Sequence, residues 1–310
     1  MNEKSKALIL MCMLVCFWGL DYVFAKEALN ILQPMSLLFL KYSVGFIVLL
    51  AIKLKVDRKA IVRLKDIPWF ILCSLTGEIL YFFCEYGAMD YIPVSLITII
   101  LSFVPAVSIF IDRILYKKKA SPKMLLGVMA CIIGVIIVIG ADFRVLLEGR
   151  ILGYLLAFGA VISWNCYNFI TAKVSENYNS ATMSFTQLTC TVLMVMPYAL
   201  HNMPPIDDFT PGVIGGIIYL GCVSAGVGFF IMVYGLKVLG PTISAMFSNF
   251  LPVTATIFGW LFLGETIGMM QFAGGALVIA SSCVVIAEKG KMEEQSNDRE
   301  AEPDNADGLL

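Results

Sequence analysis

Long apolar segments separated by short polar turns run along most of this chain. Each is about the length that a helix needs to cross the apolar core of a bilayer, roughly 20 residues at about 1.5 Å per residue. The pattern therefore predicts an all-α integral membrane protein with ten transmembrane helices. We expect the spans near residues 7–28, 35–52, 67–89, 94–115, 123–141, 151–173, 181–200, 212–236, 241–263 and 269–287. No small-residue cleavage site follows the first segment, which favours a retained span over a signal peptide.

One stretch of the apolar pattern occurs twice. Gly77–Pro105 and Ala225–Pro252 share a Tyr-Gly pair, an internal Pro and a final Phe-x-Pro, at an offset of 147 or 148 residues. Trp18 and Trp164, each followed by an Ala-Lys pair, extend the match upstream. A self-match of this length indicates two copies of one structural unit.

The repeat divides the chain into two halves with five predicted spans each. We expect the first repeat at residues 1–142 and the second at 151–288, followed by an acidic, polar and disordered tail at 289–310. Because five is odd, the second repeat must enter the membrane from the opposite side. Two inverted five-helix repeats are typical of secondary transporters, whose solute site lies near the midplane between the halves.

The distribution of Lys and Arg predicts the orientation. With the N-terminus in the cytoplasm, the segments on the cytoplasmic side carry 18 of these residues and the outer segments carry three. Positively charged loops stay on the cytoplasmic side of a membrane. We therefore expect the protein in the cytoplasmic membrane with both termini inside the cell.

Composition narrows the functional classes. Hydrophobic residues make up 59% of the chain and charged residues only 15%, and the net charge of −1 indicates no attraction to nucleic acid. The nine cysteines lie in apolar runs without metal-ligand spacing, and the chain has one histidine and no phosphate-binding glycine loop with its lysine. These observations predict neither an enzyme nor a cofactor or metal site.

Four charged residues are expected well inside the spans: Asp21, Lys41, Glu78 and Glu85. Such charges are costly and usually face the interior of the bundle. At about 1.5 Å per residue, Asp21, Lys41 and Glu85 lie roughly 7–10 Å from the outer ends of their spans and share one layer. Lys41 can pair there with Asp21 or with Glu85, and this choice stays open.

Glu78 lies one heptad before Glu85, and we expect it on nearly the same face but near the midplane. One base cannot neutralise three acids, so at least one carboxyl group is available to a solute or a proton. The alternative interpretation of the charged layer is a structural ion pair that holds the first repeat together. Asp112 precedes Arg113 and a lysine run, and we place it at the cytoplasmic interface.

Aromatic and amide side chains are weaker candidates for the lining of a solute cavity. An aromatic wall with a few polar groups suits a small amphiphilic solute, whereas ordinary packing between helices is the alternative. These candidates are Trp18, Tyr22, Tyr81, Trp164, Asn165, Asn168 and Asn249.

Several short motifs follow one another along the chain: Cys16-Phe17-Trp18-Gly19, Val23-Phe24-Ala25-Lys26, Tyr-Gly-Ala-Met at 86–89 and Phe-Val-Pro at 103–105. With these motifs the chain resembles the EamA-type branch of the drug/metabolite transporter superfamily. The resemblance covers nearly all of residues 7–288. It implies ten helices in two inverted repeats, a central cavity and alternating access for a small organic solute. The first repeat departs from the family where Lys117-Lys118-Lys119 replaces the usual Gly-Glu.

These observations predict a secondary transporter, with outward direction and proton coupling implied mainly by the family. Its predicted partners are a small-molecule substrate such as an amino acid, protons and the lipid bilayer, and the oligomeric state stays open. An alternative within transport is efflux of cationic drugs or amphiphiles, with Glu78 and Glu85 as counter-charges. The alternative from another class is a non-transporting membrane scaffold or receptor.

Overall fold

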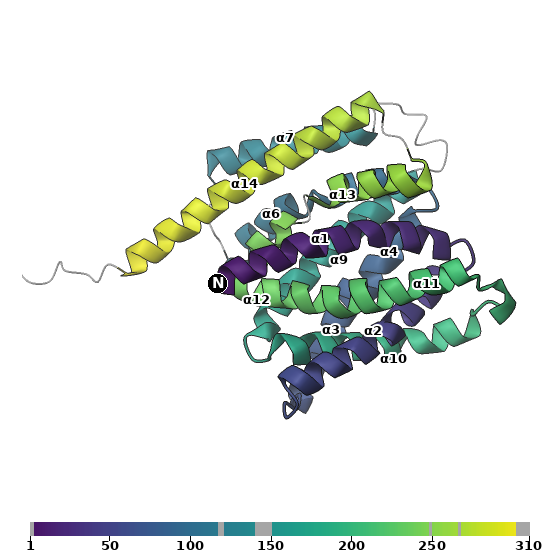
Figure 1. Ribbon diagram of the computed structural model, residues 1–310. Helices are drawn as coiled ribbons and strands as arrows, with labels where there is room; N and C mark the ends of the chain where they lie inside the picture. The colour runs from purple at the N-terminus through teal and green to yellow at the C-terminus, as the bar shows by residue number, and fades with distance from the viewer. Residues whose placement is uncertain (1–2, 117–120, 140–150, 248–249, 266–267, 302–310) are drawn as a thin grey trace, which may run out of the picture.

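The computed structural model describes residues 3–116, 121–139, 151–247, 250–265 and 268–301. Within these residues the regular structure is helical throughout, and most helices run roughly parallel or antiparallel to one another in one bundle (Figure 1). In the described part of the chain, six helical segments are long and apolar enough to cross a bilayer, and four shorter apolar helices supply the other spans. The expected all-α fold of ten spans is confirmed.

The first repeat contains five spans, of which the third and fourth are composite. Three segments in sequence build the third span, and two helices build the fourth. The elements are α1 (Glu3–Ala28), α2 (Pro34–Val56), η1 (Leu64–Asp66), α3 (Ile67–Ser74), η2 (Leu75–Leu80), α4 (Tyr81–Ala88), α5 (Val94–Leu101), α6 (Val104–Tyr116) and α7 (Pro122–Ile139).

The second repeat follows the same plan. Its third and fourth spans are again composite, and α12 continues past Gly240, where a φ of 79° interrupts the helix. The elements are α9 (Ile151–Ser175), α10 (Ser180–His201), η3 (Ile206–Asp208), α11 (Pro211–Tyr219), η4 (Leu220–Gly228), α12 (Phe229–Phe247), α13 (Leu251–Phe258), η6 (Gly259–Leu263) and α14 (Met269–Ala301).

The fourth span of the first repeat is broken, whereas the apolar pattern predicts one helix over 94–115. α5 ends at Leu101 and α6 begins at Val104, with Pro105 in its first turn. Proline lacks the backbone N–H that would continue the preceding helix, and it is well tolerated at a helix start. Pro252 occupies the corresponding place at the start of α13. Discontinuous helices at equivalent places in two repeats are typical of solute sites in transporters.

The third span of each repeat contains a π-helical segment. η2 and η4 occupy equivalent places in the two repeats. A π segment adds a residue to a turn and rotates the side chains on either side of it, and such segments often mark functional sites. In η2, Gly77 allows a close approach, because a Cβ atom there would lie 2.0 Å from Cδ2 of Tyr167.

The C-terminal helix is longer than expected. We expected disorder after Glu288, but α14 continues to Ala301. Glu, Gln, Lys and Met in this stretch are good helix formers, and Lys291 lies 3.5 Å from Glu288 one turn earlier. α14 packs along α7 at one edge of the bundle and extends beyond it (Figure 1).

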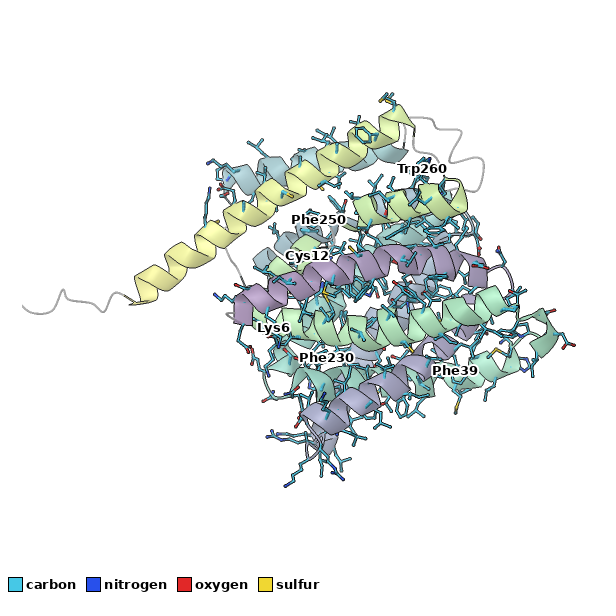
Figure 2. All side chains as sticks on the ribbon, viewed as in Figure 1. Lys6, Cys12, Phe39, Phe230, Phe250 and Trp260 are labelled. Atoms are coloured by element: carbon cyan, nitrogen blue, oxygen red, sulfur yellow. The ribbon has the colours of Figure 1, made fainter. Side chains whose placement is uncertain are left out.

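Large apolar side chains cover the outer surface of the bundle (Figure 2). Phe250 and Trp260 are two of these exposed residues. An apolar outer surface of this extent suits contact with lipid chains.

Candidate functional site

A small cavity lies between the two repeats, with walls from both of them. Its volume is about 20 Å³, comparable with that of one or two water molecules. It is lined by Trp18, Asp21 and Tyr22 of α1, Lys41 of α2, Tyr81, Phe82 and Glu85 of α4, Trp164 of α9, Ser224 of η4, Phe229 of α12 and Leu251 of α13. Three of the four charged residues that the sequence places inside the spans therefore meet at one cavity.

The first buried contact of this site is an ion pair between Lys41 and Asp21. Their Nζ and Oδ1 atoms lie 2.7 Å apart, and the two residues are 0% and 5% exposed. α1 and α2 form an antiparallel hairpin, in which Asp21 lies seven residues before the end of α1 and Lys41 seven residues after the start of α2. Equal distances from the turn place both residues at one depth. Of the two partners that the sequence allows for Lys41, the structure has Asp21.

Tyr86 completes the surroundings of the ion pair. Lys41 Nζ donates to the Tyr86 hydroxyl at 3.0 Å, and this hydroxyl donates to Asp21 Oδ2 at 3.5 Å. Nζ also lies 4.3 Å from the centre of the Phe82 ring, a cation–π contact. The ammonium group is thus enclosed by one carboxylate, one hydroxyl and one aromatic ring.

Glu85 is held by tyrosines rather than by a base. Tyr22 donates to Glu85 Oε1 at 2.7 Å, and Tyr81 donates to the same oxygen from one turn earlier on α4. Within the described part of the chain, Glu85 forms no ion pair. Two hydroxyl donors therefore orient this carboxyl group, and no basic side chain pairs with it there.

Aromatic rings from both repeats form the other wall of the cavity. The centre of the Trp18 ring lies 5.7 Å from that of Trp164 and 6.0 Å from that of Phe229. Trp164 also packs on Tyr81, with centres 4.8 Å apart. Tilted and edge contacts of this kind are favourable between aromatic rings. The wall joins α1 and α4 of the first repeat to α9 and α12 of the second.

Glu78 lies outside the cavity, contrary to the expectation that it shares a face with Glu85. It belongs to the π segment η2, is 1% exposed, and accepts a hydrogen bond from Thr191 on α10. The π segment changes the rotation per residue, so a heptad across it does not return to the same face. Glu78 therefore contacts the second repeat at a separate place.

Asn165 and Asn168, two of the three predicted amides, are not among the described residues that line the cavity. Asn165 Nδ2 donates to the carbonyl groups of Val104 at 3.2 Å and Val161 at 2.9 Å, which ties α9 to the start of α6. Asn168 is buried in α9, and its Oδ1 has no hydrogen-bond partner among the described residues. Asn249 lies outside the described residues.

The structure adds residues to the site that the sequence did not single out. Thr191 reaches Glu78 from α10, and Tyr86 bridges the ion pair. Tyr86 was visible only as a marker of the repeat, next to Glu85. The other additions, which look like ordinary members of apolar runs, are Phe82, Ser224, Phe229 and Leu251.

Comparisons with known proteins agree with this architecture. A curated relative from Salmonella typhimurium, named "probable amino-acid metabolite efflux pump", is 24% identical over 295 residues, covering 90% of this chain and 94% of its own. An "uncharacterized transporter" from Archaeoglobus fulgidus is 20% identical over 285 residues, covering 92% of this chain and all of its own. A solved crystal structure with 16% identity and a TM-score of 0.67 covers 90% of this chain and 98% of its own, which supports the fold.

The family comparison covers both repeats. The EamA-like transporter family matches residues 5–140 and again residues 151–287. Two copies of the family unit, each ending near the place where the sequence repeat ends, account for nearly the whole membrane part of the chain. The chain belongs to the EamA-like transporter family and is a membrane transporter rather than an enzyme.

Proposed function

We propose that this transporter exports a small organic metabolite, such as an amino acid or a related amine, by alternating access, and that protons moving inward drive the export. The observation that carries the proposal is the cavity between the repeats, where buried charges meet an aromatic wall. The name of the Salmonella relative, a metabolite efflux pump, supports the same direction and solute class.

The size and the walls of the cavity support alternating access. A volume of about 20 Å³ is far smaller than an amino acid, so a solute enters only when the walls separate. The rings of Trp18 and Trp164 come from different repeats and meet across the cavity. A rocking motion of one repeat against the other would part these rings on one side at a time.

Polar contacts between neighbouring segments lie at both ends of the bundle. At the end that we assign to the cytoplasm, the Tyr178 hydroxyl donates to Asp66 at 2.5 Å, and Lys237 Nζ donates to the Tyr178 carbonyl at 3.0 Å. At the other end, Val94 N–H donates to Glu265 at 3.2 Å. Glu265 of the second repeat thus caps α5 in the first repeat. We propose that the contacts at one end break while those at the other end hold, and that the two ends alternate.

Glu78 is the proposed proton carrier. Its carboxyl group is buried at the boundary between the repeats, accepts from Thr191, and forms no ion pair within the described part of the chain. A carboxyl group without a basic partner is balanced most simply by a proton. Gain or loss of that proton would alter the hydrogen bond to Thr191 and thereby the contact between the repeats.

The test is flux in proteoliposomes with a panel of amino acids, amines and organic acids, with and without a pH gradient. We expect concentrative flux of at least one solute only when the gradient is present. Glu78→Gln is expected to keep the fold and lose the dependence on the gradient. The control is Glu176→Gln, which changes an exposed carboxylate and should behave as the parent.

Two results would contradict the proposal. Absence of flux for every solute would favour a scaffold or receptor. Flux through Glu78→Gln that still responds to the pH gradient would remove Glu78 from the coupling mechanism. The sidedness also stands as a proposal: the excess of Lys and Arg on one side supports a cytoplasmic-membrane location with both termini inside.

A further inference from the structure

The charges that line the cavity are not equally available to a solute. Among the described residues that line the cavity, Lys41 is the only basic one, and an ammonium group has three N–H donors. Its surroundings already contain Asp21 at 2.7 Å, the Tyr86 hydroxyl at 3.0 Å and the Phe82 ring centre at 4.3 Å. A carboxylate on a solute could reach Lys41 only by displacing one of these groups.

Glu85, unlike Lys41, is not enclosed by a partner of opposite charge. Both tyrosine hydroxyls donate to Oε1, and neither donates to Oε2. Asp21 is matched by Lys41, whereas Glu85 has no basic partner within the described part of the chain. Glu78 also lacks one there, but Glu85, unlike Glu78, lines the cavity, where a solute can supply the counter-charge. The group that best complements this arrangement is a cation brought by the solute.

The aromatic wall also favours a positive charge on the solute. The rings of Trp18, Trp164 and Phe229 lie within 6.5 Å of one another, centre to centre. The faces of aromatic rings carry negative potential, so they attract ammonium groups and repel anions. Several rings beside one carboxylate form the usual recognition site for a substituted ammonium group.

We propose that the cavity recognises the solute by a protonated or quaternary amine, held between Glu85 and the rings of Trp18, Trp164 and Phe229, and that no carboxylate on the solute is required. The substrate class is therefore organic amines and cations, including amino-acid derivatives that lack a free carboxylate. The inference rests on the proposed function and narrows its solute class. Lys41 acts as a structural partner of Asp21 and does not bind the solute.

Intrinsic tryptophan fluorescence tests the inference by direct binding. The double change Trp69→Phe and Trp260→Phe removes two tryptophans that are 47% and 65% exposed and do not belong to the lining, which leaves Trp18 and Trp164 as reporters. The probes are benzyltrimethylammonium, 3-phenylpropanoate and 3-phenylpropan-1-ol, which have similar size and carry positive, negative and no charge. We expect saturable quenching by the cation alone.

Variants of Glu85 then locate the cation. Glu85→Gln is expected to weaken cation binding at least tenfold, and Glu85→Asp, which keeps the charge, to retain the preference for the cation. The matched control Glu27→Gln changes an exposed carboxylate near the end of α1 and should leave binding unchanged. If Glu85→Gln fails to fold, the comparison of the three probes on the parent protein still tests whether the cavity prefers a cation.

The inference is overturned if the anion binds as tightly as the cation, if the cation gives no saturable quenching, or if Glu85→Gln binds the cation as the parent does. The binding assay does not depend on flux, so the two proposals can fail separately. Flux of organic acids without cation binding would overturn this inference and leave the transport proposal intact. Cation binding without any flux would overturn the transport proposal and leave this inference intact.

Discussion

Loss of the Lys41 ammonium group is expected to destabilise the protein strongly. In Lys41→Met, Asp21 would remain buried at 5% exposure without its partner at 2.7 Å, and only the longer contact with Tyr86 at 3.5 Å would remain. Removal of one member of a buried pair typically costs about 3–5 kcal/mol. At about 1.4 kcal/mol per factor of ten, the folding equilibrium falls roughly a hundredfold to a few thousandfold.

The second substitution that restores stability to Lys41→Met identifies the residue that pairs with Lys41. Lys41→Met with Asp21→Asn removes both charges and should return stability to within about 1 kcal/mol of the parent, because no lone charge remains. Lys41→Met with Glu85→Gln leaves Asp21 unpaired and should not recover. Each variant is scored by the melting temperature of the detergent-purified protein and by its yield in the folded, monodisperse fraction.

Binding adds a second readout to this series. The Lys41→Met, Asp21→Asn protein keeps Glu85 and the aromatic wall, so we expect it to bind benzyltrimethylammonium about as the parent does. The reasoning is refuted if the Glu85 double variant recovers stability and the Asp21 double variant does not. A stable Asp21 double variant that has lost cation binding would show that Lys41 does more than hold Asp21.

Three further predictions concern the repeat interface, the tail and the topology. Gly77→Ala should abolish flux or folding, because its Cβ would overlap the Tyr167 ring, whereas Gly215→Ala on α11, with no atom within 4 Å, should be neutral in the same flux and melting assays. A chain that ends at Met292 should keep its flux per inserted molecule, because α14 beyond this point adds polar helix outside both repeats; a large loss with normal insertion would contradict this. Reporters fused to either end should be active only in the cytoplasm, and an outside signal at one end would contradict the topology.

The number of spans and the shared depth of three charges could be predicted because they depend on length alone, and the repeat because its motifs recur at a nearly constant offset. An apolar segment of about 20 residues spans a bilayer whatever it packs against. Depth also follows from counting, which is why Asp21, Lys41 and Glu85 could be placed in one layer. The counting holds because α1, α2 and α4 are regular helices at these residues.

Properties that depend on the rotation of each helix about its axis and on side-chain packing could not be predicted. The partner of Lys41 depends on which way each helix faces, and the apolar runs around it carry no marked period. The π segment η2 turned Glu78 away from Glu85 and toward Thr191, and no residue in that run signals it. Phe229 resembles every other aromatic residue in its segment, and only the packed structure shows it beside Trp18.

The most direct test of the account is access to the cavity from each side of the membrane in turn. Ser224 is buried, lines the cavity and is close to cysteine in size, so Ser224→Cys in a background without the nine native cysteines offers one reporter thiol. We expect membrane-impermeant maleimides to label it in oriented vesicles from the inside and, separately, from the outside, and a transported solute to slow both reactions. Labelling from one side only, under every condition of solute and pH gradient, would contradict alternating access through this cavity.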